Sequence, residues 1–183
     1  MEIVNTYKNR FSWYYLSKKS YHMIKQGLLL NVIEQLTQEV KRVEQNLTEV
    51  KKAAAEAPGA MQSHSDTTKF QMSQLAGKIQ NSINEKISAL SVLQKMAHSD
   101  FCLDSEKIQI GSLVETLNEN REQEFYFILP VGAGIKIINN TKTILIITPQ
   151  TPLGATLMGK RGEEMIKLQI GHRERELLIV SVL

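Results

Sequence analysis

The chain has 183 residues, of which 42% are hydrophobic and 22% are charged, with a single cysteine and a formal net charge of +3. This composition is ordinary for a folded domain and argues against a disordered chain. One cysteine excludes an internal disulfide and a cysteine-rich zinc site. No apolar run reaches the ~18–20 residues that a membrane span needs, so we expect no membrane partner.

The positive charge is concentrated at the start of the chain. Lys8, Arg10, Lys18 and Lys19 are offset there only by Glu2, and the rest of the sequence is close to neutral. Proteins that grip a phosphate backbone carry a basic stripe, and this sequence has none. We therefore expect no direct binding of nucleic acid.

Residues 1–22 show neither a helical nor a strand-like apolar period, and they lack the apolar core and cleavage site of a signal peptide. Met23 follows them directly and opens a helical pattern. We expect residues 1–22 to be an extension outside the fold, with the natural start at Met23. The alternative is an ordered arm that packs its aromatic side chains on the body of the protein.

Residues 23–99 are predicted to form an antiparallel coiled-coil hairpin. Pro58 and Gly59 end the first helix because proline lacks an amide donor and glycine frees the backbone. The connection is short, so the two helices must run antiparallel, with the tip at residues 57–70. The first apolar stripe is Ile33, Leu36, Val40, Val43, Leu47, Val50, Ala54 and Ala57, and the second is Met72, Leu75, Ile79, Ile83, Ile87, Leu90 and Leu93.

Residues 100–183 change to short β-branched and aromatic runs separated by turn residues, which is typical of strands. The run "TPLGATLMGKRG" interrupts them. Thr151 can cap a short helix there, with Pro152 at its first position and Gly159 or Gly162 at its end. The fold class is therefore α+β: a helical hairpin followed by a small, mostly antiparallel sheet with one short helix.

The tip contains His64 and Asp66, two residues apart. A standalone metal site would need a third ligand, and none is nearby in the sequence. The plainer interpretation is that Asp66 or Ser65 caps the second helix.

Four stretches of the C-terminal part stand out as motifs: "IQIGSLVET", "FYFILPVGAG", "TPLGATLMGKRGEEMIKLQI" and "RELLIVSVL". They resemble the Gre family of transcript-cleavage and elongation factors, with Thr151 standing where that family usually has serine. The resemblance covers about residues 24–183. It implies that the C-terminal domain is FKBP-like and that the hairpin is the family's coiled coil.

The resemblance also implies a partner and a mechanism of access. The C-terminal domain would dock on bacterial RNA polymerase, through Gln150, Thr151, Pro152, Leu153 and Gly154, and the coiled coil would enter the secondary channel. The protein would be cytoplasmic and monomeric, would carry no cofactor of its own, and would meet nucleic acid only indirectly within the elongation complex.

In cleaving members of the family, two tip acids in an Asp-x-x-Glu arrangement help to hold a second Mg²⁺ beside the polymerase's own. Here Asp66 matches the first acid, as a possible shared magnesium ligand, but Lys69 stands at the position of the second. A cation there opposes the binding of another cation, by ~1 kcal/mol at 4 Å even in bulk water. We expect a regulator with weak or no cleavage stimulation, and no catalytic residue of its own.

Three alternatives remain open. The protein could be an active cleavage factor of the Gre type. It could be an FKBP-like prolyl isomerase with a chaperone arm, although Phe125, Tyr126 and Phe127 are consecutive and alternate between the faces of a strand. It could also be a structural adaptor that dimerises through the heptad stripe.

Overall fold

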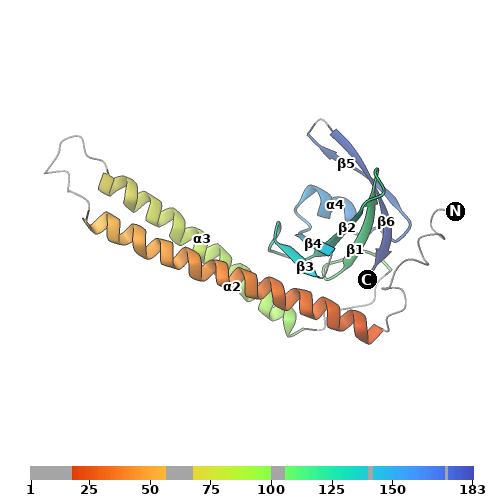
Figure 1. Ribbon diagram of the computed structural model, residues 1–183, viewed down its shortest axis with the longest axis horizontal. Helices are drawn as coiled ribbons and strands as arrows, with labels where there is room; N and C mark the ends of the chain where they lie inside the picture. The colour runs from red at the N-terminus through yellow and green to blue at the C-terminus, as the bar shows by residue number, and fades with distance from the viewer. Residues whose placement is uncertain (1–17, 57–67, 100–105, 140–141, 172) are drawn as a thin grey trace. The chain divides into compact units, whose positions relative to one another are not determined.

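The computed structural model describes residues 18–56, 68–99, 106–139, 142–171 and 173–183. The chain divides into two compact units, one comprising Ile33–Val92 and the other comprising Met1–Val32 and Leu93–Leu183. The first is a helical hairpin, and the second contains a six-stranded sheet with one short helix (Figure 1). The α+β fold class is thereby confirmed. Within the described ranges, no helix is long and apolar enough to cross a bilayer.

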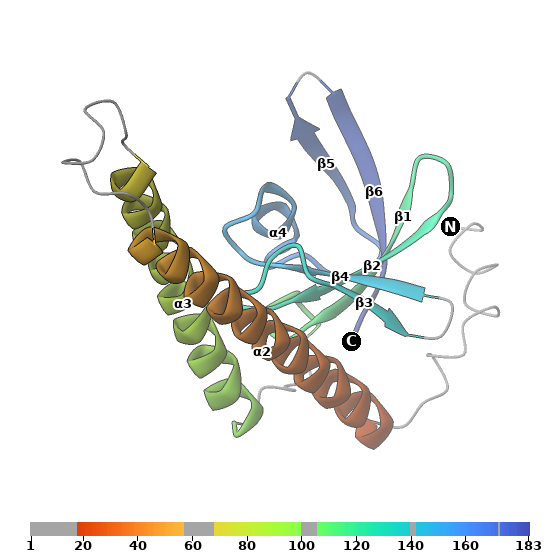
Figure 2. The ribbon, with the colours of Figure 1, turned by 60° about the vertical axis from the view of Figure 1, so that its left-hand side comes forward.

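The hairpin is built from α2 (Lys18–Glu56) and α3 (Thr68–Ala97), which run side by side in opposite directions (Figures 1 and 2). Their apolar stripes meet in a seam whose buried members are Val40, Leu47 and Ile83, with Val43, Ala76, Ile79 and Leu90 packed against them. At the side of the seam, Lys86 Nζ lies 2.8 Å from Glu39 Oε1. The apolar stripes of α2 and α3 therefore cover each other within one chain.

The predicted stripe of α3 is wrong in two positions. Leu75 and Ile87 are 44% and 47% exposed, and Ala76 takes a place in the seam instead. Because a helix turns about 100° per residue, Ala76 lies within about 20° of Ile83 whereas Leu75 lies about 80° away.

Helix α2 begins at Lys18, five residues before Met23, so its first turn lies in the stretch expected to be an extension. The residues before Lys18, and the tip between Glu56 and Thr68, lie outside the described residues. Near the start of α2, Leu28, Leu29 and Val32 are also buried. They precede Ile33, the first position that the heptad pattern predicted.

The sheet has the strand order β3-β4-β2-β1-β6-β5. In chain order its strands are β1 (Leu113–Asn118), β2 (Gln123–Ile128), β3 (Lys136–Asn139), β4 (Lys142–Ile147), β5 (Met165–Ile170) and β6 (Arg173–Val182). All neighbours pair antiparallel except β2 and β4, which are parallel.

The parallel pair follows from where the chain turns after β2. Gly132 and Gly134 both have φ of +89°, a conformation that other residues rarely adopt. The Gly134 amide donates to the Ile146 carbonyl at 2.9 Å, which brings the chain to the outer side of β4. Strand β3 then forms the edge of the sheet, and β4 returns beside β2 in the same direction.

Helix α4 (Pro152–Leu157) covers one face of this sheet. Leu157 is fully buried in a cluster that it shares with residues of five strands. Its fellow members are Ile108, Val114, Tyr126, Ile128, Ile147, Ile166, Leu177 and Ile179. Burial of this many large side chains, each contributing ~1.5–3 kcal/mol, fixes the position of α4 and of the loop before it.

Candidate functional site

The segment 151–154 begins α4 and contains most of the predicted docking residues. The Thr151 hydroxyl accepts a hydrogen bond from the Gly154 amide at 3.1 Å and donates to the Thr148 carbonyl at 2.7 Å. Pro152 occupies the first turn, where its missing amide proton has no consequence. The threonine therefore acts as the N-cap that the sequence predicted.

Gly154 is buried and has no room for a side chain. A Cβ built on it would lie 2.0 Å from the Thr148 carbonyl oxygen and 2.9 Å from Thr151 Oγ1. Leu153 is half-buried and packs against the sheet core. Thr151 and Gly154 are thus explained by the folding of the loop itself.

Gln150 and Pro152 are exposed, and their side chains are available to a partner. Beyond the helix, Lys160 and Arg161 flank the same segment, and each has an acid nearby. Lys160 Nζ lies 3.2 Å from Glu164 Oε2, and Arg161 Nη1 lies 3.8 Å from Glu106 Oε2. The Arg161 amide and Lys160 together hold the pKa of Glu164 below its usual range. The surface around the segment is therefore nearly neutral.

At the far end of the hairpin, the structure describes Lys69 but not its predicted companions. Lys69 is exposed in the first turn of α3, and its carbonyl accepts a hydrogen bond from Ser73 Oγ at 2.8 Å. A cation in the first turn opposes the helix dipole. His64 and Asp66 lie outside the described residues, so the spacing between Asp66 and Lys69 remains a prediction from sequence.

The described residues contain no group of three or more His, Cys, Asp or Glu side chains placed to hold a metal ion. Glu56, at the end of α2, lies 4.0 Å from Lys52, and both side chains are exposed. Such surface pairs contribute little to stability.

Two features were not predicted from the sequence. One is a groove on α3 lined by Phe70 and Gly77, whose signal in the sequence is a glycine inside a helical pattern. The other is the carboxylate of Glu115, which is buried in the middle of β1. No signal in the sequence distinguishes Glu115 from an exposed strand residue, because every second residue of a strand is expected to be polar.

The aromatic residues Phe125, Tyr126 and Phe127 of β2 are all buried. Tyr126 lies in the cluster beneath α4, while its two neighbours point to the opposite face, as alternation along a strand requires. They line neither the groove on α3 nor a second groove beside Leu117 and Met165. No described feature favours a proline-binding pocket.

Comparison with known proteins finds no matching family model and no curated protein of significant sequence similarity. Among solved structures, the transcription factor Gfh1 is 22% identical, covers 82% of this chain and 92% of its own, and gives a TM-score of 0.35. GreA factor homolog 1 (Gfh1) of Thermus thermophilus is 21% identical, with coverages of 82% and 94% and a TM-score of 0.33. Gfh1 of Thermus aquaticus is 21% identical, with coverages of 81% and 92% and a TM-score of 0.35.

These neighbours are Gre-factor homologues, the family that the sequence motifs resemble. TM-scores this low carry no weight on what the chain does.

Proposed function

We propose that this protein is a cytoplasmic, monomeric regulator of transcription elongation that binds bacterial RNA polymerase and inserts its coiled coil into the secondary channel. The C-terminal domain docks on the polymerase surface, and the hairpin carries its tip toward the catalytic centre. The effect on RNA cleavage is weak or absent.

The observation that carries this proposal is the hairpin seam. Val40, Leu47 and Ile83 are buried between α2 and α3 of one chain, so the apolar stripe is already satisfied. An adaptor that dimerises through the same stripe would need it open. A two-helix arm with a closed seam is suited to entering a narrow, wet channel as a single rigid element.

The loop before α4 supports the docking half of the proposal. Thr151 and Gly154 shape the loop, and this shape leaves Gln150 and Pro152 exposed at its surface. We propose that these two side chains make the contacts with the polymerase, with Leu153 fixing the loop to the sheet core. Because the surrounding charges are paired, the contact would depend on shape more than on salt.

The cation at Lys69 supports the weak-cleavage half. Magnesium is a hard cation that prefers oxygen ligands, mainly carboxylates and water. Lys69 is exposed at the start of α3, where the family resemblance places a second acid. A tip with one carboxylate, Asp66, and one ammonium group is a poor holder of a second metal ion, and it would occupy the channel without promoting cleavage.

A binding assay with core RNA polymerase tests the proposal. The purified chain should co-sediment with the polymerase, and a photo-crosslinker at position 66 should label subunits that line the secondary channel. Replacing both Gln150 and Pro152 by alanine should weaken binding about tenfold, while Glu85→Gln on α3 should leave it unchanged. The proposal fails if the unmodified chain does not bind, or if the crosslinks never reach the channel.

A further inference from the structure

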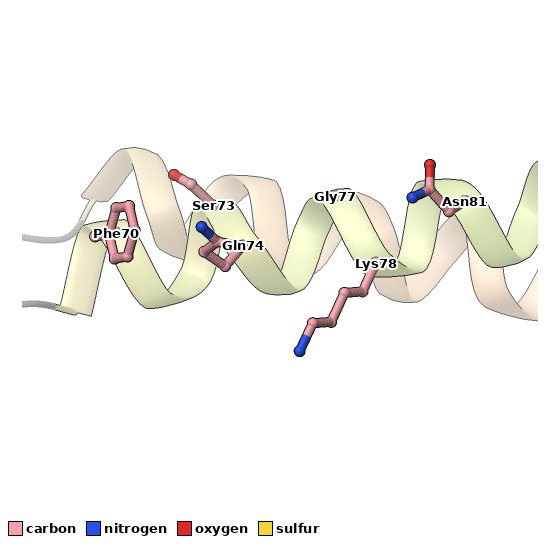
Figure 3. A pocket seen from close by; sticks show the side chains of 6 residues that line it. All are labelled: Phe70, Ser73, Gln74, Gly77, Lys78 and Asn81. Atoms are coloured by element: carbon pink, nitrogen blue, oxygen red, sulfur yellow. The ribbon is translucent and has the colours of Figure 1, made fainter.

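The outer face of α3, on the side away from the seam, bears an open groove of about 440 Å³ near the start of the helix. Figure 3 shows that its lining comes from α3: Phe70, Ser73, Gln74, Gly77, Lys78 and Asn81. These residues are three, four or seven apart, which places them on one face of a helix. The groove lies wholly within the hairpin unit.

Gly77 forms the floor of the groove, and the fold does not require it. A Cβ built on Gly77 would meet nothing within 4 Å, and its φ is that of an ordinary helix. Glycine is a poor helix former, so a glycine in the interior of a helix lowers stability unless something gains from the missing side chain. No described residue fills the space beside Gly77, so a gain from the missing side chain would come from a partner.

Phe70 and Lys78 show what kind of partner would fit. Phe70 is 66% exposed although it is a large apolar side chain. Lys78 has no ion-pair partner among the residues that the structure describes, and it is the one charged residue that lines the groove. Phe70 therefore offers an apolar contact, and Lys78 offers an unpaired cation, within the same groove.

The outer face of α2 has a different character. Exposed charges of both signs follow one another along it, including Lys41, Arg42, Glu44, Glu49 and Lys52. Such a face is well solvated and costly to strip of water. The groove on α3 is lined by a single charged side chain, Lys78, so a close contact there removes water from fewer charges than a contact on the outer face of α2.

We infer that the groove on α3 receives a protein segment of the RNA polymerase channel wall. That segment approaches the helix backbone at Gly77, places an apolar side chain against Phe70, and presents a carboxylate to Lys78. The inference rests on the proposed function, which brings the arm into the channel, and it adds the face and the residues by which the arm is held there.

The test substitutes the groove residues and measures affinity for core RNA polymerase. Gly77→Gln fills the notch with a good helix former, and Lys78→Glu opposes the partner's carboxylate. Each should weaken binding at least tenfold without lowering the thermal midpoint of the hairpin followed by circular dichroism. Lys41→Glu on α2 and Ser88→Gln further along the outer face of α3 are matched controls that should bind normally.

A zero-length carbodiimide crosslink provides a second readout. It should join the Lys78 amine to an acidic residue of the polymerase, and Lys78→Arg should abolish this product while preserving the charge. Absence of the product in a complex that forms with normal affinity would contradict the inference.

The remaining outcomes separate this inference from the function on which it rests. If the unmodified chain does not bind polymerase, both fall. If it binds and the groove variants bind equally well, only the groove inference is overturned. Self-association that Gly77→Gln abolishes would assign the groove to a second copy of the chain. If the groove variants bind polymerase with unchanged affinity but lose their crosslinks to RNA, the groove would be assigned to nucleic acid.

Discussion

Glu115 Oε2 accepts a hydrogen bond from Ser181 Oγ at 3.3 Å across β1 and β6, while Glu115 Oε1 has no hydrogen-bond partner among the described residues. The side chain is only 4% exposed. Burial raises the pKa of this carboxyl above its usual value, and the nearby positive charge of Lys142 and the Ser181 hydrogen bond offset this effect only in part. The ionised form of Glu115 is therefore destabilising in the folded sheet.

The first prediction concerns Glu115→Gln. Because the folded-state pKa is raised, the favourable contribution of the protonated group is complete below the unfolded pKa and is lost as pH rises through the folded pKa. The amide variant does not ionise, so it should be more stable than the unmodified protein at pH 8, by roughly 1 kcal/mol, and gain less at pH 4. Urea unfolding at both pH values measures this, with the exposed Glu85→Gln as the control. An equal gain at both pH values would contradict it.

The second prediction concerns Gly154→Ala. The added methyl group would overlap the Thr148 carbonyl oxygen, so the loop before α4 must shift, and the sheet domain should lose about 2–4 kcal/mol of stability. Gly162→Ala is the matched control, because its Cβ would meet only the Val180 carbonyl oxygen at 3.8 Å. Thermal unfolding of both variants decides the point, and similar midpoints would show that the loop can relax.

The third prediction concerns the N-cap. Thr151→Ser keeps the hydroxyl that accepts from the Gly154 amide and should be nearly neutral. Thr151→Ala removes it and should cost about 1 kcal/mol in denaturant unfolding. A loss in the serine variant as large as in the alanine variant would mean that the methyl group of Thr151, and not its hydroxyl, matters.

The fourth prediction concerns Lys69→Glu, which places an acid where the cleaving members of the Gre family have one. RNA cleavage in backtracked polymerase complexes should rise at least severalfold over the unmodified chain, because the tip then carries two possible magnesium ligands. Asp66→Ala added to this variant should abolish the gain, and Lys41→Glu on α2 should produce none. Strong cleavage by the unmodified chain would refute our interpretation of the tip.

The same substitution has a consequence for stability that does not depend on the polymerase. Lys69 lies in the first turn of α3, where a negative side chain is favoured by the helix dipole. Lys69→Glu should therefore stabilise the isolated protein by about 0.3–1 kcal/mol at low salt. The gain should shrink in high salt, and a gain that persists there would point to a local contact instead.

The sequence predicted those parts of the fold that follow from repeated local patterns. The stripe of Val40, Val43 and Leu47 was read correctly because one face of a long helix repeats several times. The seam position that Ala76 takes was wrongly assigned to Leu75, because hydrophobicity alone favours leucine there. The spacing of seven residues between Ala76 and Ile83 was the signal in the sequence that indicates the alanine.

Tertiary pairing was also beyond the reach of the local pattern. The parallel pairing of β2 with β4 depends on the path that the chain takes around Gly132 and Gly134, and strand propensity is the same in either direction. In the candidate site, the cap at Thr151 was predicted from residue type and position. The burial of Gly154 and the exposure of Pro152 could not be predicted, because they depend on how α4 packs on the sheet.

The ion pair between Lys86 and Glu39 has a consequence for the register between α2 and α3. An apolar repeat of seven residues tolerates a slip of one helix along the other by a whole repeat, because like positions meet again. After such a slip, Lys86 would face Asn46 or Val32 in place of Glu39, and its charge would be left without a counterpart. The pair therefore selects one register among near-equivalent ones. It fixes the position of α3 along α2, and hence the position of Lys69 relative to the end of α2.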